Sequence, residues 1–87
     1  MIEIENQMIF IKEEDKMIAY ISFPKTDENT VNINHTFTHQ SRRGEGLAKK
    51  LMDALYDHLK QNNLKALPTC SYAVVYFERY PEKRDIL

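Results

Sequence analysis

The sequence predicts a mixed α+β fold with the element order β-β-β-α-β-α, and three observations lead to this prediction. The chain has 87 residues, which is the size of one domain. Its 43% hydrophobic and 29% charged residues, with only two glycines and three prolines, are typical of a globular protein. Apolar residues alternate before residue 40 and follow a helical repeat after residue 46. We therefore expect one α+β (α/β) domain over residues 1–87, an antiparallel meander followed by one parallel β-α-β crossover.

The first three strands are predicted from runs of β-branched and aromatic residues. Residues 8–12 and 17–23 form two such runs, separated by the polar turn Glu13-Glu14-Asp15-Lys16. After a polar segment that begins at Pro24, apolar and polar residues alternate over residues 31–39. This alternation predicts a third strand.

An amphipathic helix is predicted to follow the third strand. From Gly46 onward, leucines recur at positions 47, 51, 55 and 59, which indicates about four helical turns. Gln61-Asn62-Asn63 supplies the stop, because Asn tolerates a left-handed backbone.

The last two elements are a short strand and a second helix. Residues 64–69 predict a strand parallel to residues 31–39. Pro68 has no N–H to donate to a ladder, so this strand is expected to be unpaired on one side, where a ligand would find room. Ser71 is expected to cap a helix that runs through Tyr80 and is closed by Pro81.

The charge of the chain argues against a general nucleic-acid binder and indicates where an anionic ligand would bind. A net charge of −1 argues against a general nucleic-acid binder, whose affinity depends on neutralising phosphates. Residues 1–30 carry seven acidic and three basic side chains, and the rest of the chain is net basic. An anionic ligand is therefore expected in the second half.

Cysteine usage and hydropathy suggest the compartment. Cys70 is the single cysteine, so no internal disulfide is possible, and the chain opens without a basic and apolar leader. The longest apolar run has four residues, from Met8 to Ile11, which is too short to span a bilayer. We expect a cytoplasmic monomer with no membrane partner.

The segment Gln40–Lys50 is the richest candidate for chemistry. It holds both glycines, and it lies between a strand and a helix start, where free backbone N–H groups and the helix dipole favour an anion. Four cations surround this helix start, where they oppose the dipole unless an anion is bound: Arg42, Arg43, Lys49 and Lys50. The alternative is an ordinary strand–helix turn with solvated lysines. The spacing of the glycines excludes a Walker A loop and the dinucleotide fingerprint.

Several short motifs resemble one known family. Arg43-Gly-Glu-Gly-Leu-Ala48 matches the pyrophosphate-binding pattern Gln/Arg-x-x-Gly-x-Gly/Ala of the GNAT superfamily of acyl-CoA-dependent N-acetyltransferases. His35-Thr36, Leu67-Pro68-x-Cys70-Ser71-Tyr72 and Tyr80-Pro81-Glu82 are similar to segments of very small GNAT-like proteins. The resemblance covers nearly the whole chain, and it implies a GNAT-like mixed sheet with splayed strands.

The resemblance also implies a binding site for acetyl-CoA. The loop would hold the pyrophosphate, and the pantetheine would lie between the splayed strands, bonded to main chain at Phe37 and Thr38. The implied contact residues are Phe37, Thr38, Arg42, Arg43, Gly44, Glu45, Gly46, Leu47, Ala48, Lys49, Cys70, Ser71 and Tyr76.

Three residues are candidates for catalysis. Cys70 stands at the end of a strand beside a helix start that favours its thiolate, so it is a candidate nucleophile, or else a small buried hydrophobe. His35 would orient Cys70 across the parallel strand pair, or is simply packed. The tyrosine that acts as general acid in many GNAT enzymes is Phe77 here, which leaves Tyr76 or Tyr72 as substitutes unless they only pack. The three histidines and Cys70 lack metal-ligand spacing, so we predict no metal.

Three functions are compatible with these residues. The first is transfer of an acetyl group from acetyl-CoA to a small amine or a protein amine, directly or through Cys70. The second is a non-catalytic module that binds or senses acyl-CoA. The third is an interaction domain whose basic loop binds another anion such as RNA. The acceptor stays unnamed, because the segments that shape the amine pocket of larger GNAT enzymes have no counterpart in the chain.

Overall fold

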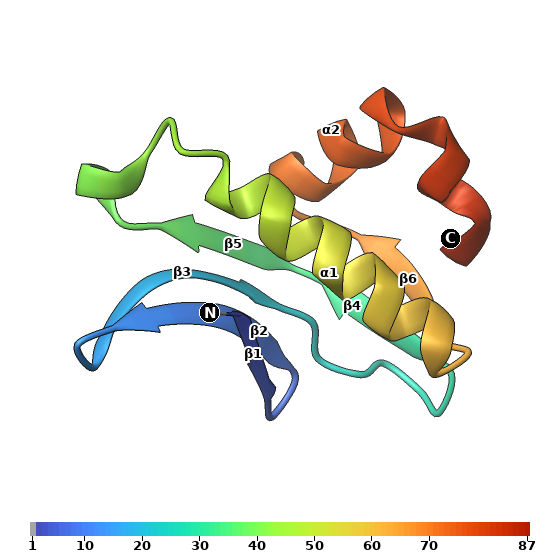
Figure 1. Ribbon diagram of the computed structural model, residues 1–87. Coiled ribbons are helices and arrows are strands. Elements are labelled where there is room, and N and C mark those ends of the chain that lie inside the picture. Colours follow the sequence, from blue (N-terminus) through green and yellow to red (C-terminus); the bar gives the residue numbers. More distant parts are fainter. Residues whose placement is uncertain (1) are drawn as a thin grey trace.

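A computed structural model of the chain describes residues 2–87 (Figure 1). Its strands and helices are β1 (Ile2–Glu5), β2 (Met8–Glu13), β3 (Lys16–Ser22), β4 (Thr30–Ile33), β5 (His35–Thr38), α1 (Leu47–Gln61), β6 (Lys65–Pro68) and α2 (Ser71–Arg79). Two short 3₁₀ helices, η1 (Gln40–Arg42) and η2 (Pro81–Ile86), complete the fold. The predicted mixed α+β class is confirmed, while β1, η1 and η2 were not predicted.

The first sheet is an antiparallel meander with the order β1-β2-β3-β5. Two tight hairpins build it, and the two residues at the centre of each turn have positive φ: Asn6 and Gln7 in the first, Glu14 and Asp15 in the second. Such turns match the right-handed twist of the strands they join. The polar turn between residues 12 and 17 was thus correctly predicted as a hairpin.

The prediction of one strand over residues 31–39 is wrong, because the chain changes sheets at Asn34. β4 pairs in parallel with β6, with Ile33 opposite Pro68, whereas β5 pairs antiparallel with β3. Asn34 is fixed between them, since its Oδ1 accepts a hydrogen bond from Ser22 Oγ at 2.5 Å and its N–H donates to the Ser22 carbonyl at 3.3 Å. No ladder joins β5 to β6 within residues 2–87, so the strands are splayed as the resemblance implied.

Helix α1 packs against the strands and contributes several leucines to the hydrophobic core. It contacts β2, β3, β5 and β6, and in Figure 1 it begins above β5 and passes in front of β4, while α2 lies above the strands. Leu51, Leu55 and Leu59 are fully buried. The helix ends in a Schellman motif: Asn63 has φ 56°, its N–H donates to the Lys60 carbonyl, and the next N–H donates to Leu59. The asparagine stop is therefore confirmed.

The N-cap of helix α2 lies one residue earlier than predicted. The Ala73 N–H donates to Cys70 Sγ at 3.4 Å, so Cys70, not Ser71, is the N-cap. At an N-cap, a serine hydroxyl accepts a hydrogen bond from the N–H three residues later. The Cys70 thiol stands in the same position relative to Ala73 and accepts this bond in its place. After Pro81 the chain continues through η2 and buries Ile86 in the core.

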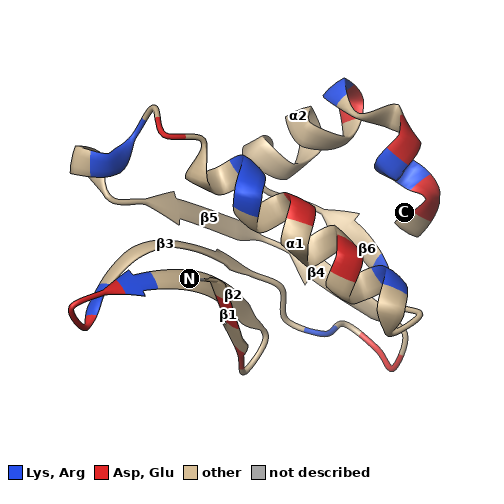
Figure 2. Ribbon diagram, viewed as in Figure 1, with Lys and Arg blue, Asp and Glu red and all other residues tan. Residues whose placement is uncertain are grey.

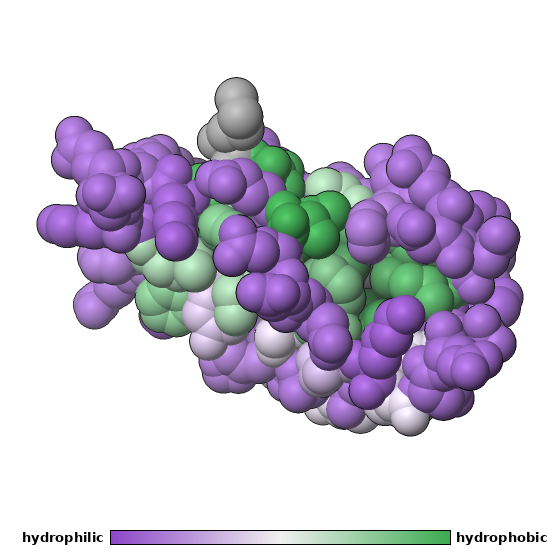
Figure 3. All heavy atoms as spheres, turned by 90° about the horizontal axis from the view of Figure 1, so that it is seen from below, coloured by the Kyte–Doolittle hydropathy of each residue, from purple (hydrophilic) through white to green (hydrophobic). Residues whose placement is uncertain are grey.

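The surface of the described residues is polar at both ends of the molecule. Seen from below, apolar atoms reach the surface between these hydrophilic ends (Figure 3). Ile2 and Ile4 lie opposite the buried Ile11 and Ile9 on the edge strand β1, but they stay 38% and 43% exposed. No helix among residues 2–87 is both long and apolar enough to cross a membrane.

Candidate functional site

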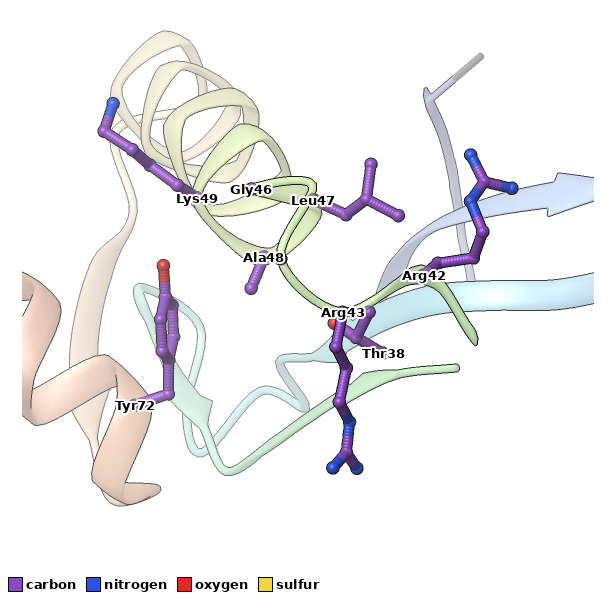
Figure 4. A pocket seen from close by; sticks show the side chains of 9 residues that line it. Thr38, Arg42, Arg43, Gly46, Leu47, Ala48, Lys49 and Tyr72 are labelled. Atoms are coloured by element: carbon purple, nitrogen blue, oxygen red, sulfur yellow. The ribbon is translucent and has the colours of Figure 1, made fainter. Parts of the chain in front are cut away.

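An open pocket of about 310 Å³ lies where β5 ends and α1 begins (Figure 4). Its walls come from one continuous stretch of chain, the end of β5, the following loop and the first turn of α1, and from the first turn of α2 farther along the sequence. The lining residues are Thr38, Arg42, Arg43, Gly44, Gly46, Leu47, Ala48, Lys49 and Tyr72. All of them except Tyr72 belong to the contact set predicted for CoA.

The glycines give the loop its shape through backbone conformation. Gly44 has φ 91° and Gly46 has φ 74°, values that other residues adopt at a cost, and a Cβ at either position would meet no atom within 4 Å. Gly46 is the N-cap of α1 and offers no side chain to the first helical turn. The free N–H groups and the positive end of the helix dipole therefore face the pocket without an internal cap.

Two of the four cations at this helix start, Arg42 and Lys49, are already paired with carboxylates. Arg42 Nη1 donates to Glu13 at 2.6 Å, and its Nε and Nη2 donate to Glu45 at 2.7 and 2.9 Å. The hydrogen bonds that Arg42 donates to Glu45 and Glu13 raise the pKa of Arg42, and those it donates to Glu45 lower the pKa of Glu45. Figure 2 shows the blue loop before α1 above the charged turn between β2 and β3.

Arg43 and Lys50 differ from these two. Neither has an ion-pair partner within 4.0 Å among the described residues. Figure 4 shows the Arg43 and Arg42 side chains pointing in opposite directions from the loop. Arg43 is therefore the lining cation that can meet an anion without first breaking a salt bridge.

Lys49 belongs to a network that reaches the core. Asp53 accepts hydrogen bonds from Lys49 Nζ at 2.8 Å and from the Tyr76 hydroxyl at 2.6 Å. Partial burial acts against the charged form of Asp53, but the bonds from Lys49 and Tyr76 hold its pKa below the ordinary value. Burial and the bond to Asp53 raise the pKa of Tyr76, which is only 2% exposed.

The tyrosine that lines the pocket is Tyr72, not Tyr76. Tyr76 donates its only hydroxyl proton to Asp53 and does not line the pocket. Tyr72 lies one helical turn earlier, half-buried, and Figure 4 shows its hydroxyl directed toward the start of α1. Burial raises the pKa of Tyr72, so its hydroxyl keeps its proton at neutral pH. In the sequence, only its place in the first turn of the helix separates Tyr72 from Tyr76, so the sequence alone leaves both as substitutes.

Cys70 and His35 are not brought together as predicted. Cys70 caps α2 and its N–H donates to the Ile33 carbonyl at 3.2 Å, next to the strand break. His35 belongs to β5, which pairs with β3 instead of β6, and its ring lies 5.5 Å from that of Tyr20. Within residues 2–87 no hydrogen bond joins the two side chains. The expectation that His35 faces Cys70 across the parallel pair is therefore wrong.

The remaining predicted residues surround the pocket without lining it. Phe37 stacks on Tyr20 with ring centroids 5.4 Å apart, so its side chain does not line the pocket, although its backbone lies on the unpaired edge of β5. Glu45 is exposed in the loop, and Ser71 is the first residue of α2. Among the described residues, no group of three or more His, Cys, Asp or Glu side chains is placed to hold a metal ion.

Comparison with known proteins finds relatives of similar sequence and a solved structure of similar fold. Protein NATD1 from Xenopus tropicalis is 33% identical over 63 residues, which is 72% of this chain and 58% of the relative. The match thus spans little more than half the length of that relative. The NMR structure of a GCN5-like protein from Staphylococcus aureus is 31% identical with a TM-score of 0.82, and the match covers 99% of this chain and 85% of the other.

Larger enzymes share the fold alone. An aminoglycoside N-acetyltransferase solved in complex with CoA has a TM-score of 0.57 at 13% identity, with 87% of this chain and 64% of that chain covered. A family model described as GCN5-related N-acetyl-transferase matches residues 7–86. Nearly all of the chain, including the glycine loop and both helices, is inside that match, and so the chain belongs to the GCN5-related N-acetyltransferase family.

Proposed function

We propose that the chain binds acetyl-CoA in the pocket at the start of α1 and transfers the acetyl group to an amine. The observation that carries this proposal is the uncapped start of α1, which opens onto the pocket beside Arg43. Backbone N–H groups and a dipole of the right sign are a general solution for binding a diphosphate. The glycine conformations keep the loop free of side chains that would cover it.

The rest of the donor would extend from the loop toward the splayed strands. β5 is the edge of its sheet on the side away from β3, and Thr38 at its end lines the pocket. An extended amide-containing chain such as pantetheine can bond to an unpaired strand edge as an added strand does. In this proposal the thioester would lie toward Cys70 and the first turn of α2.

The transfer itself needs an attacking amine and a proton for the leaving group. In the direct route the amine nitrogen attacks the thioester carbonyl, the C–N bond forms, the C–S bond breaks, and the amine loses a proton. Tyr72 is the residue placed to give a proton to the departing CoA thiolate, because it lines the pocket with a protonated hydroxyl. In the covalent route Cys70 Sγ attacks the thioester carbonyl, the C–S bond to CoA breaks, and the proton lost by the Cys70 thiol ends on the departing CoA thiolate. The amine then attacks the acetyl-cysteine, the new C–N bond replaces the C–S bond, and the proton lost by the amine restores the Cys70 thiol.

The binding step is tested by titrating CoA and following backbone NMR shifts. We expect shifts confined to residues 36–49 and 70–80. Arg43→Glu is expected to weaken binding by about tenfold or more, because it reverses a charge that lies on the pocket wall. Arg84→Glu is the matched control, since Arg84 is exposed in η2 and should leave the affinity unchanged. Shifts spread over the molecule, or equal losses in the two variants, would contradict the proposed site.

The transfer step is tested separately. Mass spectrometry after mixing with acetyl-CoA should show an adduct of one acetyl group on Cys70 if the covalent route operates, and no adduct on Cys70→Ser. With an amine panel, Tyr72→Phe should slow thiol release while CoA affinity is retained. A non-catalytic acyl-CoA-binding module is the second candidate, favoured by the placement of Tyr76 and His35 away from the pocket. Saturable CoA binding without thiol release for any amine would establish it.

A further inference from the structure

Arg42 is held between two carboxylates at the edge of the pocket. Its Nε and Nη2 donate to the two oxygens of Glu45 at 2.7 and 2.9 Å, a bidentate pair, and its Nη1 donates to Glu13 at 2.6 Å. A phosphate group binds a guanidinium through the same fork of N–H groups. Glu45 therefore occupies the part of Arg42 that would otherwise bind a phosphate.

The charge of this cluster is opposite to what a diphosphate needs. One guanidinium with two carboxylates carries a net charge of −1, and three of the five N–H donors of Arg42 are used inside the cluster. A phosphate that approaches Arg42 while Glu45 is in place meets a nearby negative charge. The fork formed by Nε and Nη2 of Arg42 becomes available to a phosphate only when Glu45 leaves.

The two carboxylates differ in how easily they can leave. Both side chains are about half exposed, 45% for Glu45 and 52% for Glu13, but Glu45 lies between Gly44 and Gly46, where the loop has open space on both sides. Glu13 belongs to the ladder of β2 and β3, opposite Lys16, so its backbone is fixed by the sheet. A competing anion would displace the loop carboxylate and leave Arg42 anchored by Glu13.

We propose that Glu45 is a built-in competitor of the ligand's phosphate for Arg42, and that Glu13 is the positioning residue that keeps Arg42 at the pocket. This inference rests on the proposed function, because the competing anion is the diphosphate of CoA. Glu45 then determines specificity: it lowers the affinity for phosphate-bearing donors and leaves phosphate-free donors unaffected.

The test is calorimetry of wild type, Glu45→Gln and Glu13→Gln with CoA and with inorganic pyrophosphate. We expect Glu45→Gln to bind both probes about three- to tenfold more tightly, since it frees the bidentate fork. Glu13→Gln is the matched control, because it removes one carboxylate from the same guanidinium. Simple relief of repulsion would give equal gains in the two variants. If Glu45 is the competitor and Glu13 positions Arg42, only Glu45→Gln gains affinity, and Glu13→Gln binds no more tightly than wild type.

Two further measurements separate the possible failures. Pantetheine, which has no phosphate, should bind or compete equally well with wild type and Glu45→Gln, and the NMR resonance of Arg42 Nε–H should shift when CoA is added to wild type. CoA binding by wild type with no gain in Glu45→Gln, or with equal gains in both variants, would overturn this inference alone. Absence of CoA binding by wild type would remove the proposed function and this inference together.

Discussion

Asp53 joins the surface of α1 to the core through two hydrogen bonds, and this single residue explains why Tyr76 can be buried. The Tyr76 hydroxyl finds its acceptor at 2.6 Å, and the same carboxylate holds Lys49 at the pocket wall. A buried hydroxyl without a partner would be costly. The hydroxyl of Tyr76, a candidate general acid in the sequence analysis, is therefore used in a hydrogen bond to Asp53 inside the protein.

Tyr76→Phe is expected to lower the free energy of unfolding by about 1.5–3 kcal/mol at neutral pH, because it removes a buried hydrogen bond to a charged group. Urea denaturation measures this loss. The pKa of Asp53 is lowered in the folded state, so the stability linked to its charge is present above the unfolded value of 3.8 and is lost as the pH falls below it. The effect of Tyr76→Phe should therefore shrink in acid.

Tyr56→Phe provides the matched control for this prediction. Tyr56 also donates its hydroxyl to an aspartate, Asp85, at 2.7 Å, but this contact is exposed to solvent. Its removal should cost well under half as much as the loss at Tyr76. Equal costs for the two variants would show that burial of Tyr76 does not strengthen its hydrogen bond.

At the scale of elements, the start of α2 gives one cysteine two roles that must be separated. Cys70 caps the helix through its Sγ, and it is also the candidate nucleophile. Any variant at this position changes both the cap and the reactive group. A loss of activity in Cys70→Ala is therefore ambiguous by itself.

Cys70→Ser and Cys70→Ala resolve this ambiguity as a pair. Serine is a strong N-cap, so we expect Cys70→Ser to keep the stability of wild type, whereas Cys70→Ala should lose about 1 kcal/mol in thermal or urea denaturation. If the covalent route operates, Cys70→Ser should lose the acetyl adduct at unchanged stability. Full activity in both variants would leave Cys70 with its structural role only.

The elements were predictable where a local signal determines them. The hairpin at Glu13–Lys16, helix α1 and its asparagine stop each depend on residues within one turn of each other. The break at Asn34 gave no such signal, because the alternation of residues 31–39 continues across it while the partner strand changes from β6 to β3. β1 alternates apolar and acidic residues over residues 2–5, a strand pattern that went unpredicted in this short edge strand, whose four residues are all exposed.

The candidate site was predictable in its backbone and less so in its side chains. Two glycines between a strand and a helix located the loop correctly on the pocket wall. The pairing of Arg42 with Glu13 joins residues 29 positions apart, and only the tertiary fold brings them together. Tyr72 and Tyr76 lie four residues apart on the same side of α2, and only the tertiary fold puts Tyr72 at the pocket and Tyr76 against Asp53.

At the scale of the whole molecule, the described residues form a flattened body of 34 × 27 × 19 Å whose two sheets share no ladder. Helix α1 contacts strands of both sheets and is the main connection between them. A ligand bound at the start of α1 and along the edge of β5 would add contacts between these parts. Ligand binding should therefore stabilise the fold as a unit.

CoA at about 100 times its dissociation constant is expected to add about 2.7 kcal/mol to the free energy of unfolding. For a domain of this size, that corresponds to an increase in melting temperature of roughly 10 °C or more. Differential scanning fluorimetry measures the increase, and Arg43→Glu at the same CoA concentration should show a much smaller one. An unchanged melting temperature in wild type at saturating CoA would contradict binding to the folded chain.

The strand break has a mechanical consequence for the whole molecule. Asn34 is the single residue between β4 and β5, so a change in its backbone dihedral angles changes the angle between the two strands. Ser22 on the neighbouring strand holds Asn34 through its hydroxyl at 2.5 Å and its carbonyl at 3.3 Å. A few degrees of rotation at Asn34 would change the opening between β5 and β6 while each sheet keeps its own ladder. The width of this opening therefore depends on the conformation at Asn34 together with α1, which contacts strands of both sheets.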